Sequence, residues 1–131
     1  MAKVLVVDKD GAFLEQVKEL LARAGHEALT CGEGEAALAL AQEAVPALVV
    51  LGTLAGRQEA PDLCRRLKGE GGRPAVVVVD ERGPGGWPAD EGKAMEAEEY
   101  LCRPFEESVF LAIVDEVVQR GQPAKEVLFA Q

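Results

Sequence analysis

The side chains of this chain that could do chemistry stand where short apolar runs end. Asp8 follows the first such run and Asp80 follows the fourth, whereas the third run ends at Gly52. Carboxylates can bind a divalent cation, and a carboxylate can also accept a phosphoryl group as a nucleophile. Glycine has no side chain, so no such reaction can occur at position 52.

The elements that position these residues follow from the pattern of the chain. Apolar runs rich in valine alternate with segments of helical period, which is typical of βα units that build a parallel sheet. We expect strands at 4–7, 27–30, 47–51, 75–79 and 99–102, and helices at 11–24, 33–44, 61–68, 89–96 and from after Pro104 to about 120. Since the carboxyl ends of parallel strands meet at one edge, Asp8, Gly52 and Asp80 should gather there.

A chain of 131 residues fits a single domain with one core. We expect this domain to span residues 1–120, with 121–131 as a C-terminal tail or linker. The density of Gly and Pro at 83–88 predicts a loop.

Fourteen basic and 23 acidic residues give a net charge of −9, which opposes binding to nucleic acid or to an anionic membrane. No apolar run approaches the roughly 20 residues that cross a bilayer, so a cytoplasmic protein is expected. The three cysteines, Cys31, Cys64 and Cys102, lack metal-binding spacing and are expected to be buried thiols.

Four segments resemble the receiver domain of two-component response regulators, and the resemblance extends from about residue 3 to 120. They are residues 4–8, 46–51, 65–68 and 100–105. The resemblance implies a flavodoxin-like α/β fold: a three-layer sandwich with a five-stranded parallel sheet in the order 2-1-3-4-5 and five helices. It also implies a cis peptide bond between Arg103 and Pro104.

The chain departs from the family at most of the functional positions. Asp8 matches the first of two acids that hold Mg²⁺ in the family, but Lys9 replaces the second acid. Gly52 replaces the aspartate that accepts phosphate, and Val79 replaces a Thr or Ser. Arg103 replaces a lysine, so only one acid of the family's site remains.

These substitutions predict a domain without metal, cofactor or enzymatic activity. Asp8 alone beside the cation of Lys9 is a poor ligand set for Mg²⁺, and Gly52 cannot form an acyl phosphate. Lys9 either neutralises Asp8 and Asp80 in place of a metal or faces solvent. Arg103 can pair with either acid.

A partner surface is expected near the fifth strand and the last helix. Its candidate residues are Tyr100, Trp87, Val109 and Leu111. Tyr100 can equally be a half-buried cover of the sheet edge, and Trp87 can fold back as a plug. Val109 and Leu111 can equally belong to a broad core face of the helix.

The leading interpretation is a phosphorylation-independent pseudo-receiver that binds a protein, either another signalling protein or a second copy of itself. One alternative is a working receiver with a displaced acceptor, Asp80 or Thr53. Another is a domain that binds a small ligand in the space left at Gly52.

Overall fold

Five parallel strands form one sheet in the order β2-β1-β3-β4-β5, as the resemblance implied. The computed structural model describes residues 2–52, 59–70, 72–80 and 97–120. The strands are β1 (Lys3–Val7), β2 (Glu27–Cys31), β3 (Leu48–Leu51), β4 (Ala75–Asp80) and β5 (Glu99–Cys102).

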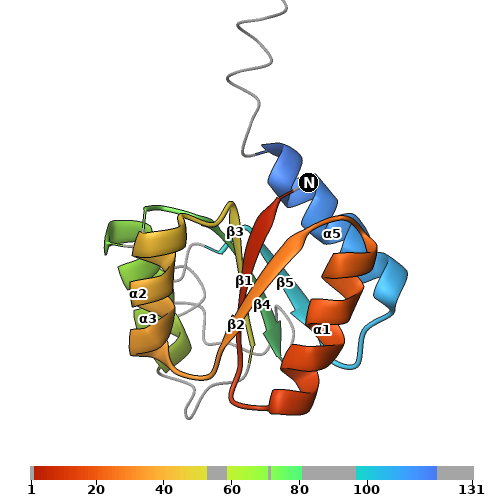
Figure 1. Ribbon diagram of the computed structural model, residues 1–131, viewed down its shortest axis with the longest axis horizontal. Helices are drawn as coiled ribbons and strands as arrows, with labels where there is room; N and C mark the ends of the chain where they lie inside the picture. The colour runs from red at the N-terminus through yellow and green to blue at the C-terminus, as the bar shows by residue number, and fades with distance from the viewer. Residues whose placement is uncertain (1, 53–58, 71, 81–96, 121–131) are drawn as a thin grey trace, which may run out of the picture.

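Helices cover both faces of this sheet and make the expected three layers (Figure 1). Helices α1 (Gly11–Arg23) and α5 (Glu107–Arg120) lie on one face, and α2 (Gly34–Ala44) and α3 (Glu59–Glu70) lie on the other. Four of the five expected helices are thus described. The fifth, expected at 89–96, falls outside the described residues.

The core has two parts because strand side chains alternate between the two faces. Leu5 and Val7 of β1 point to the side of α2 and α3, whereas Val4 and Val6 point to the side of α1 and α5. All the residues of β3 are buried. Burial on both faces explains why the central strands read as unbroken apolar runs.

Element ends differ from the expectations by a few residues. α1 begins after Asp10, whose carboxylate accepts a hydrogen bond from the Ala12 N–H at 3.0 Å, a typical N-cap. Gly25 follows the helix with φ of 89°, a left-handed conformation that favours glycine. α3 is longer than expected, and β4 extends by one residue to Asp80.

Candidate functional site

The sheet brings the expected residues to one edge. In the strand register Val7 is opposite Leu51, and Leu51 is opposite Val78. Asp8 and Gly52 therefore follow neighbouring strands at the same level. Arg103 comes one residue after the end of β5, whose Cys102 is opposite Asp80.

The centre of the site is an ion pair between Arg103 and Asp8. Arg103 Nη2 donates a hydrogen bond to Asp8 Oδ2, and Asp8 Oδ1 accepts a further bond from the Asp10 N–H at 2.7 Å. The Asp8 side chain is fully buried, and that of Arg103 is 17% exposed. A buried carboxylate needs a compensating charge, and here a side chain of the protein supplies it.

This ion pair fills the space beside Gly52. A Cβ atom at position 52 would lie 2.6 Å from Arg103 Nη2 and 3.0 Å from Asp8 Cγ, and closer still to Asp8 Oδ2. Real Cβ atoms essentially never approach other atoms so closely. The expectation that the missing side chain leaves an empty pocket at the strand edge is therefore wrong, because the long arginine side chain reaches into that space.

The guanidinium group of Arg103 has a second support. Its Cζ atom lies 3.6 Å from the centre of the Phe13 ring, in a cation–π arrangement. Its Nε atom is buried and has no hydrogen-bond partner among the described residues. The Arg103–Pro104 peptide bond is cis, as the resemblance implied.

Lys9 and Val79 are not members of this ion pair. Lys9 is exposed, and no ion pair joins it to another residue whose side chain is described. Val79 is fully buried within the core between the sheet and α1 and α5. Asp80 ends β4, but its side chain is not among those described, and Thr53 lies outside the described residues.

The candidate partner residues occupy different surroundings. Tyr100 is half-buried against the core on the side of α2 and α3, and this burial, with the nearby Cys64, raises the pKa of its phenol. Val109 is 43% exposed, whereas Leu111 packs against the other core cluster. Residues two apart on a helix lie about 200° apart around its axis, so these two side chains do not share one face. Trp87 lies outside the described residues.

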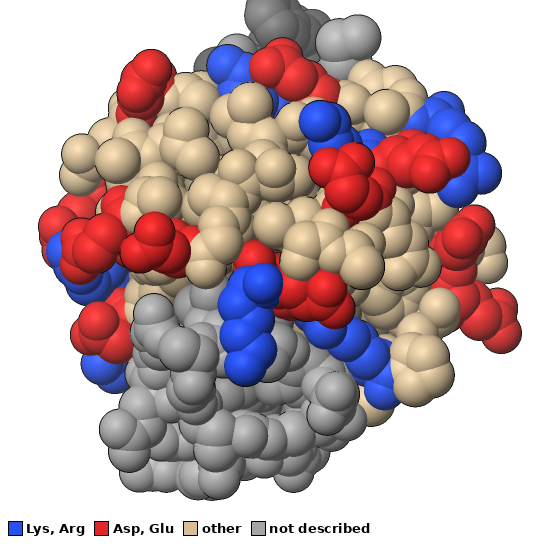
Figure 2. Space-filling model, turned by 60° about the horizontal axis from the view of Figure 1, so that its bottom comes forward, with Lys and Arg blue, Asp and Glu red and all other residues tan. Residues whose placement is uncertain are grey.

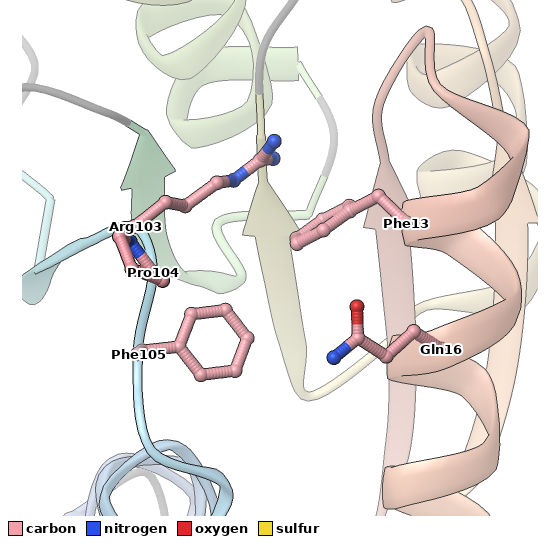
Figure 3. Close-up of a pocket in the computed structure, with 5 residues that line it drawn as sticks. All are labelled: Phe13, Gln16, Arg103, Pro104 and Phe105. Carbon is pink, nitrogen blue, oxygen red and sulfur yellow. The ribbon is translucent and has the colours of Figure 1, made fainter.

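A pocket that the sequence did not reveal lies next to the ion pair. It has a volume of about 490 Å³ and is lined by Phe13, Gln16, Arg103, Pro104 and Phe105 (Figure 3). The helical period assigns Phe13 to the core, which is correct, since only 7% of it is exposed. Nothing in the sequence indicates that residues 90 positions further along the chain would face it across a cavity.

The described residues were compared with the requirements of a metal site and of a membrane-spanning helix. Within the described part of the chain, no group of three or more His, Cys, Asp or Glu residues is arranged to hold a metal ion. No helix in that part has the length and apolar character needed to cross a membrane.

The three cysteines differ in their burial. Cys64 is buried, but Cys102 is exposed at the end of the edge strand, so the expectation of three buried thiols is wrong.

Charges of both signs are mixed on the surface that Figure 2 shows. Lys and Arg side chains there lie beside Asp and Glu side chains, and no broad basic area forms among the described residues of this face.

No model of a protein family matches the chain. The chain is 28% identical over 127 residues to the DNA-binding response regulator MtrA of Mycolicibacterium paratuberculosis, covering 94% of this chain and 55% of that protein. It is 27% identical over 121 residues to the probable transcriptional regulator ycf27 of Porphyra purpurea, covering 91% and 48%. The chain thus spans about half the length of the curated relatives it matches.

The fold of the chain is similar to that of solved receiver-domain structures. The chemotaxis protein CheY4 of Vibrio cholerae superposes with a TM-score of 0.76 at 25% identity, covering 89% of this chain and 98% of that one. NtrX from Brucella abortus superposes with a TM-score of 0.85 at 24% identity, covering 99% of this chain and 29% of that one. The chain therefore has the fold of receiver domains, and its sequence relatives and structural neighbours are response regulators and their receiver domains.

Proposed function

We propose that this chain is a pseudo-receiver in two-component signalling, which acts by binding a protein and needs no phosphorylation. The observation that carries the proposal is the Asp8–Arg103 ion pair, which occupies the place where a side chain at Gly52 would project. The family resemblance puts the phosphate-accepting aspartate at this position. Here that position has no nucleophile, and a side chain placed there would have to displace the Asp8 and Arg103 side chains.

The ion pair also opposes magnesium binding. Mg²⁺ is held in proteins by carboxylates and waters in octahedral geometry. The only carboxylate retained from the family's pair is Asp8, and Arg103 already neutralises it. A metal would have to displace a guanidinium that is also packed over Phe13.

The same contacts favour a single fixed conformation. Asp8 follows β1 and Arg103 follows β5, so their pairing links two strands that β3 and β4 separate in the sheet, across 95 residues of sequence. A switch needs two arrangements that a ligand can bias. Because this pairing needs neither phosphate nor metal, we infer that the chain is a constitutive binding module.

The partner is a protein, either another signalling protein or a second copy of this chain. The proposed contact surface includes Tyr100 and the exposed Val109, with Trp87 as a further candidate. Leu111 packs against the core away from the face of Val109, so it is left out of this surface. The relative MtrA is named as DNA-binding, but this chain covers only about half of that protein. The net charge of −9 favours protein over nucleic acid as the partner here.

The direct test is a titration of the full chain with Mg²⁺ and beryllofluoride, followed by amide NMR, alongside incubation with acetyl phosphate and intact mass analysis. We expect no saturable shifts at Asp8, Gly52 or Arg103 and no added phosphoryl group. A phosphoryl group at Asp80 or Thr53 would contradict the proposal and establish a displaced acceptor.

A gain-of-function series provides the positive control. The variant Gly52→Asp alone should remain silent, because Arg103 still pairs with Asp8 in the space that the new side chain needs. The triple variant Lys9→Asp, Gly52→Asp, Arg103→Lys restores the second acid, the acceptor aspartate and the lysine that the resemblance assigns to the site, and it should gain magnesium-dependent shifts. Efficient phosphorylation of the single variant would show that the ion pair does not block the site.

A further inference from the structure

The pocket beside the ion pair has no part in the function proposed above. It lies between the first turns of α1, which contribute Phe13 and Gln16, and the segment 103–105 that follows β5. Figure 3 shows the two groups of side chains facing each other across an open gap. Its volume of about 490 Å³ lies within the range of roughly 300–1,000 Å³ that small-molecule sites occupy.

The walls of this pocket are aromatic and held in place by the core. The Phe105 ring stacks on the buried Phe110 with centres 5.2 Å apart, and it meets the Phe13 ring edge-on with centres 6.5 Å apart. Arg103 is fixed by Asp8 on one side and by Phe13 on the other. A ligand would therefore enter a pocket that is already formed, at little cost in side-chain entropy.

Among the described residues that line the pocket, Arg103 alone is charged. The positive charge of Arg103 is already matched by the buried Asp8. Glu106 directly follows the lining residue Phe105, and Glu19 lies one helical turn from Gln16; both are exposed. The Gln16 amide, in contrast, can donate and accept hydrogen bonds to an uncharged polar edge.

We infer that this pocket binds a small, uncharged, planar aromatic molecule. Its ring packs against Phe13, Pro104 and Phe105 where they line the pocket, without entering between the two phenyl rings, and its polar edge meets the Gln16 amide. Aromatic pairs of this kind stabilise contacts beyond the area that they bury. The inference is independent of phosphorylation and of the protein partner.

The test uses indole as the uncharged probe and indole-3-carboxylate as the matched anion. Each is titrated into the full chain and followed by amide NMR. Indole should give saturable shifts centred on Phe13, Gln16, Arg103 and Phe105. The carboxylate should bind at least about tenfold more weakly, a difference of about 1.4 kcal/mol.

Two variants locate the binding. Gln16→Trp puts an indole ring at the mouth of the pocket and should abolish the shifts, and since Gln16 is exposed on α1 the fold should be retained. Gln42→Trp makes the same change at an exposed position of α2, on the other face of the sheet, and should bind indole as the parent chain does.

Equal binding of indole by the Gln16→Trp variant would overturn the inference, as would shifts spread over the whole molecule or equal affinity for the carboxylate. An absence of saturable indole binding would also overturn it. None of these results bears on the magnesium and beryllofluoride experiment, so the two proposals fail separately.

Discussion

The side chains of Asp8 and Arg103 occupy the space into which a side chain at position 52 would project. The two residues are bound to each other, and Asp8 is further held by the Asp10 N–H. A larger residue at position 52 would have to push this pair apart. Arg103 can pair with Asp8 in this arrangement because residue 52 has no side chain, and the pair in turn disfavours a larger residue at position 52.

The variant Gly52→Ala should therefore destabilise the protein by about 1–3 kcal/mol, the usual cost of overpacking. Gly69→Ala is the matched control, because a Cβ there meets nothing within 4 Å and alanine favours the helix. Urea unfolding followed by circular dichroism measures both. In an Arg103→Ala background the cost of Gly52→Ala should fall, and equal costs in the two backgrounds would show that the Arg103 side chain is not the obstacle.

Tyr100 allows a second test at this scale because it is the only tyrosine of the chain. Burial is the main cause that raises the pKa of its phenol, so the folded protein favours the neutral form. This contribution to stability is complete below the ordinary value of about 10 and is lost as the pH rises through the higher folded pKa. Absorbance of the phenolate should give a higher midpoint in the folded chain than in urea. Identical midpoints would contradict the half-buried position.

At the scale of elements, one carboxylate adds a polar link between α3 and the sheet, beside the apolar core that they share. Glu98 accepts hydrogen bonds from Lys68 Nζ of α3 at 2.6 and 2.7 Å, and its Oε1 also accepts the Val76 N–H of β4 at 2.6 Å. The Glu98 side chain is 31% exposed and that of Lys68 is 15% exposed. Because the Val76 residue is buried, its N–H has no water to replace this partner.

Removal of this carboxylate in Glu98→Ala should destabilise the protein by about 2 kcal/mol, mainly through the unsatisfied Val76 N–H. Glu98→Gln retains an acceptor and should lose less. The control is Glu35→Ala, which removes an ion pair with Arg66 between exposed side chains and should have a smaller effect than Glu98→Ala. Thermal unfolding compares the three variants, and an equal effect of Glu35→Ala would show that Glu98 has no special role.

At the scale of the whole molecule, the proposed domain of residues 1–120 ends with α5. This helix and α1 cover the same face of the sheet. Three apolar residues of α5 are buried in the core there: Phe110, Val114 and Val117. His26 adds a link, since its ring contacts Asp115 of α5 at 3.0 Å and accepts the Ala2 N–H at 3.0 Å. α5 is therefore part of the folded unit.

A chain that stops after Arg120 should retain the unfolding free energy of the full chain to within about 0.5 kcal/mol, the usual range for changes outside the core. A chain that stops after Glu106 should fail to fold, because it loses three buried apolar side chains. Urea unfolding tests the first chain and amide NMR dispersion tests the second. A large loss of stability in the first would place residues 121–131 within the domain.

The sequence by itself determined the order and type of the described elements. Hydrophobic period is a local property, so the apolar runs and helical stripes could be read without knowledge of their neighbours. The sequence also shows that the third apolar run ends in Gly52. Comparison with the family shows that Asp8 is the one acid of the site that remains. The strand order came from the family resemblance, which rests on short matched segments such as residues 100–105.

Only the tertiary structure decided how Arg103 is used. The sequence left its partner open between Asp8 and Asp80, left Lys9 as a competing cation, and did not connect Phe13 with Arg103 at all. These contacts join residues about 90 positions apart, and they depend on strand register and on how a long side chain packs over its neighbours. The same packing filled the space at Gly52 and left the pocket between α1 and the segment after β5.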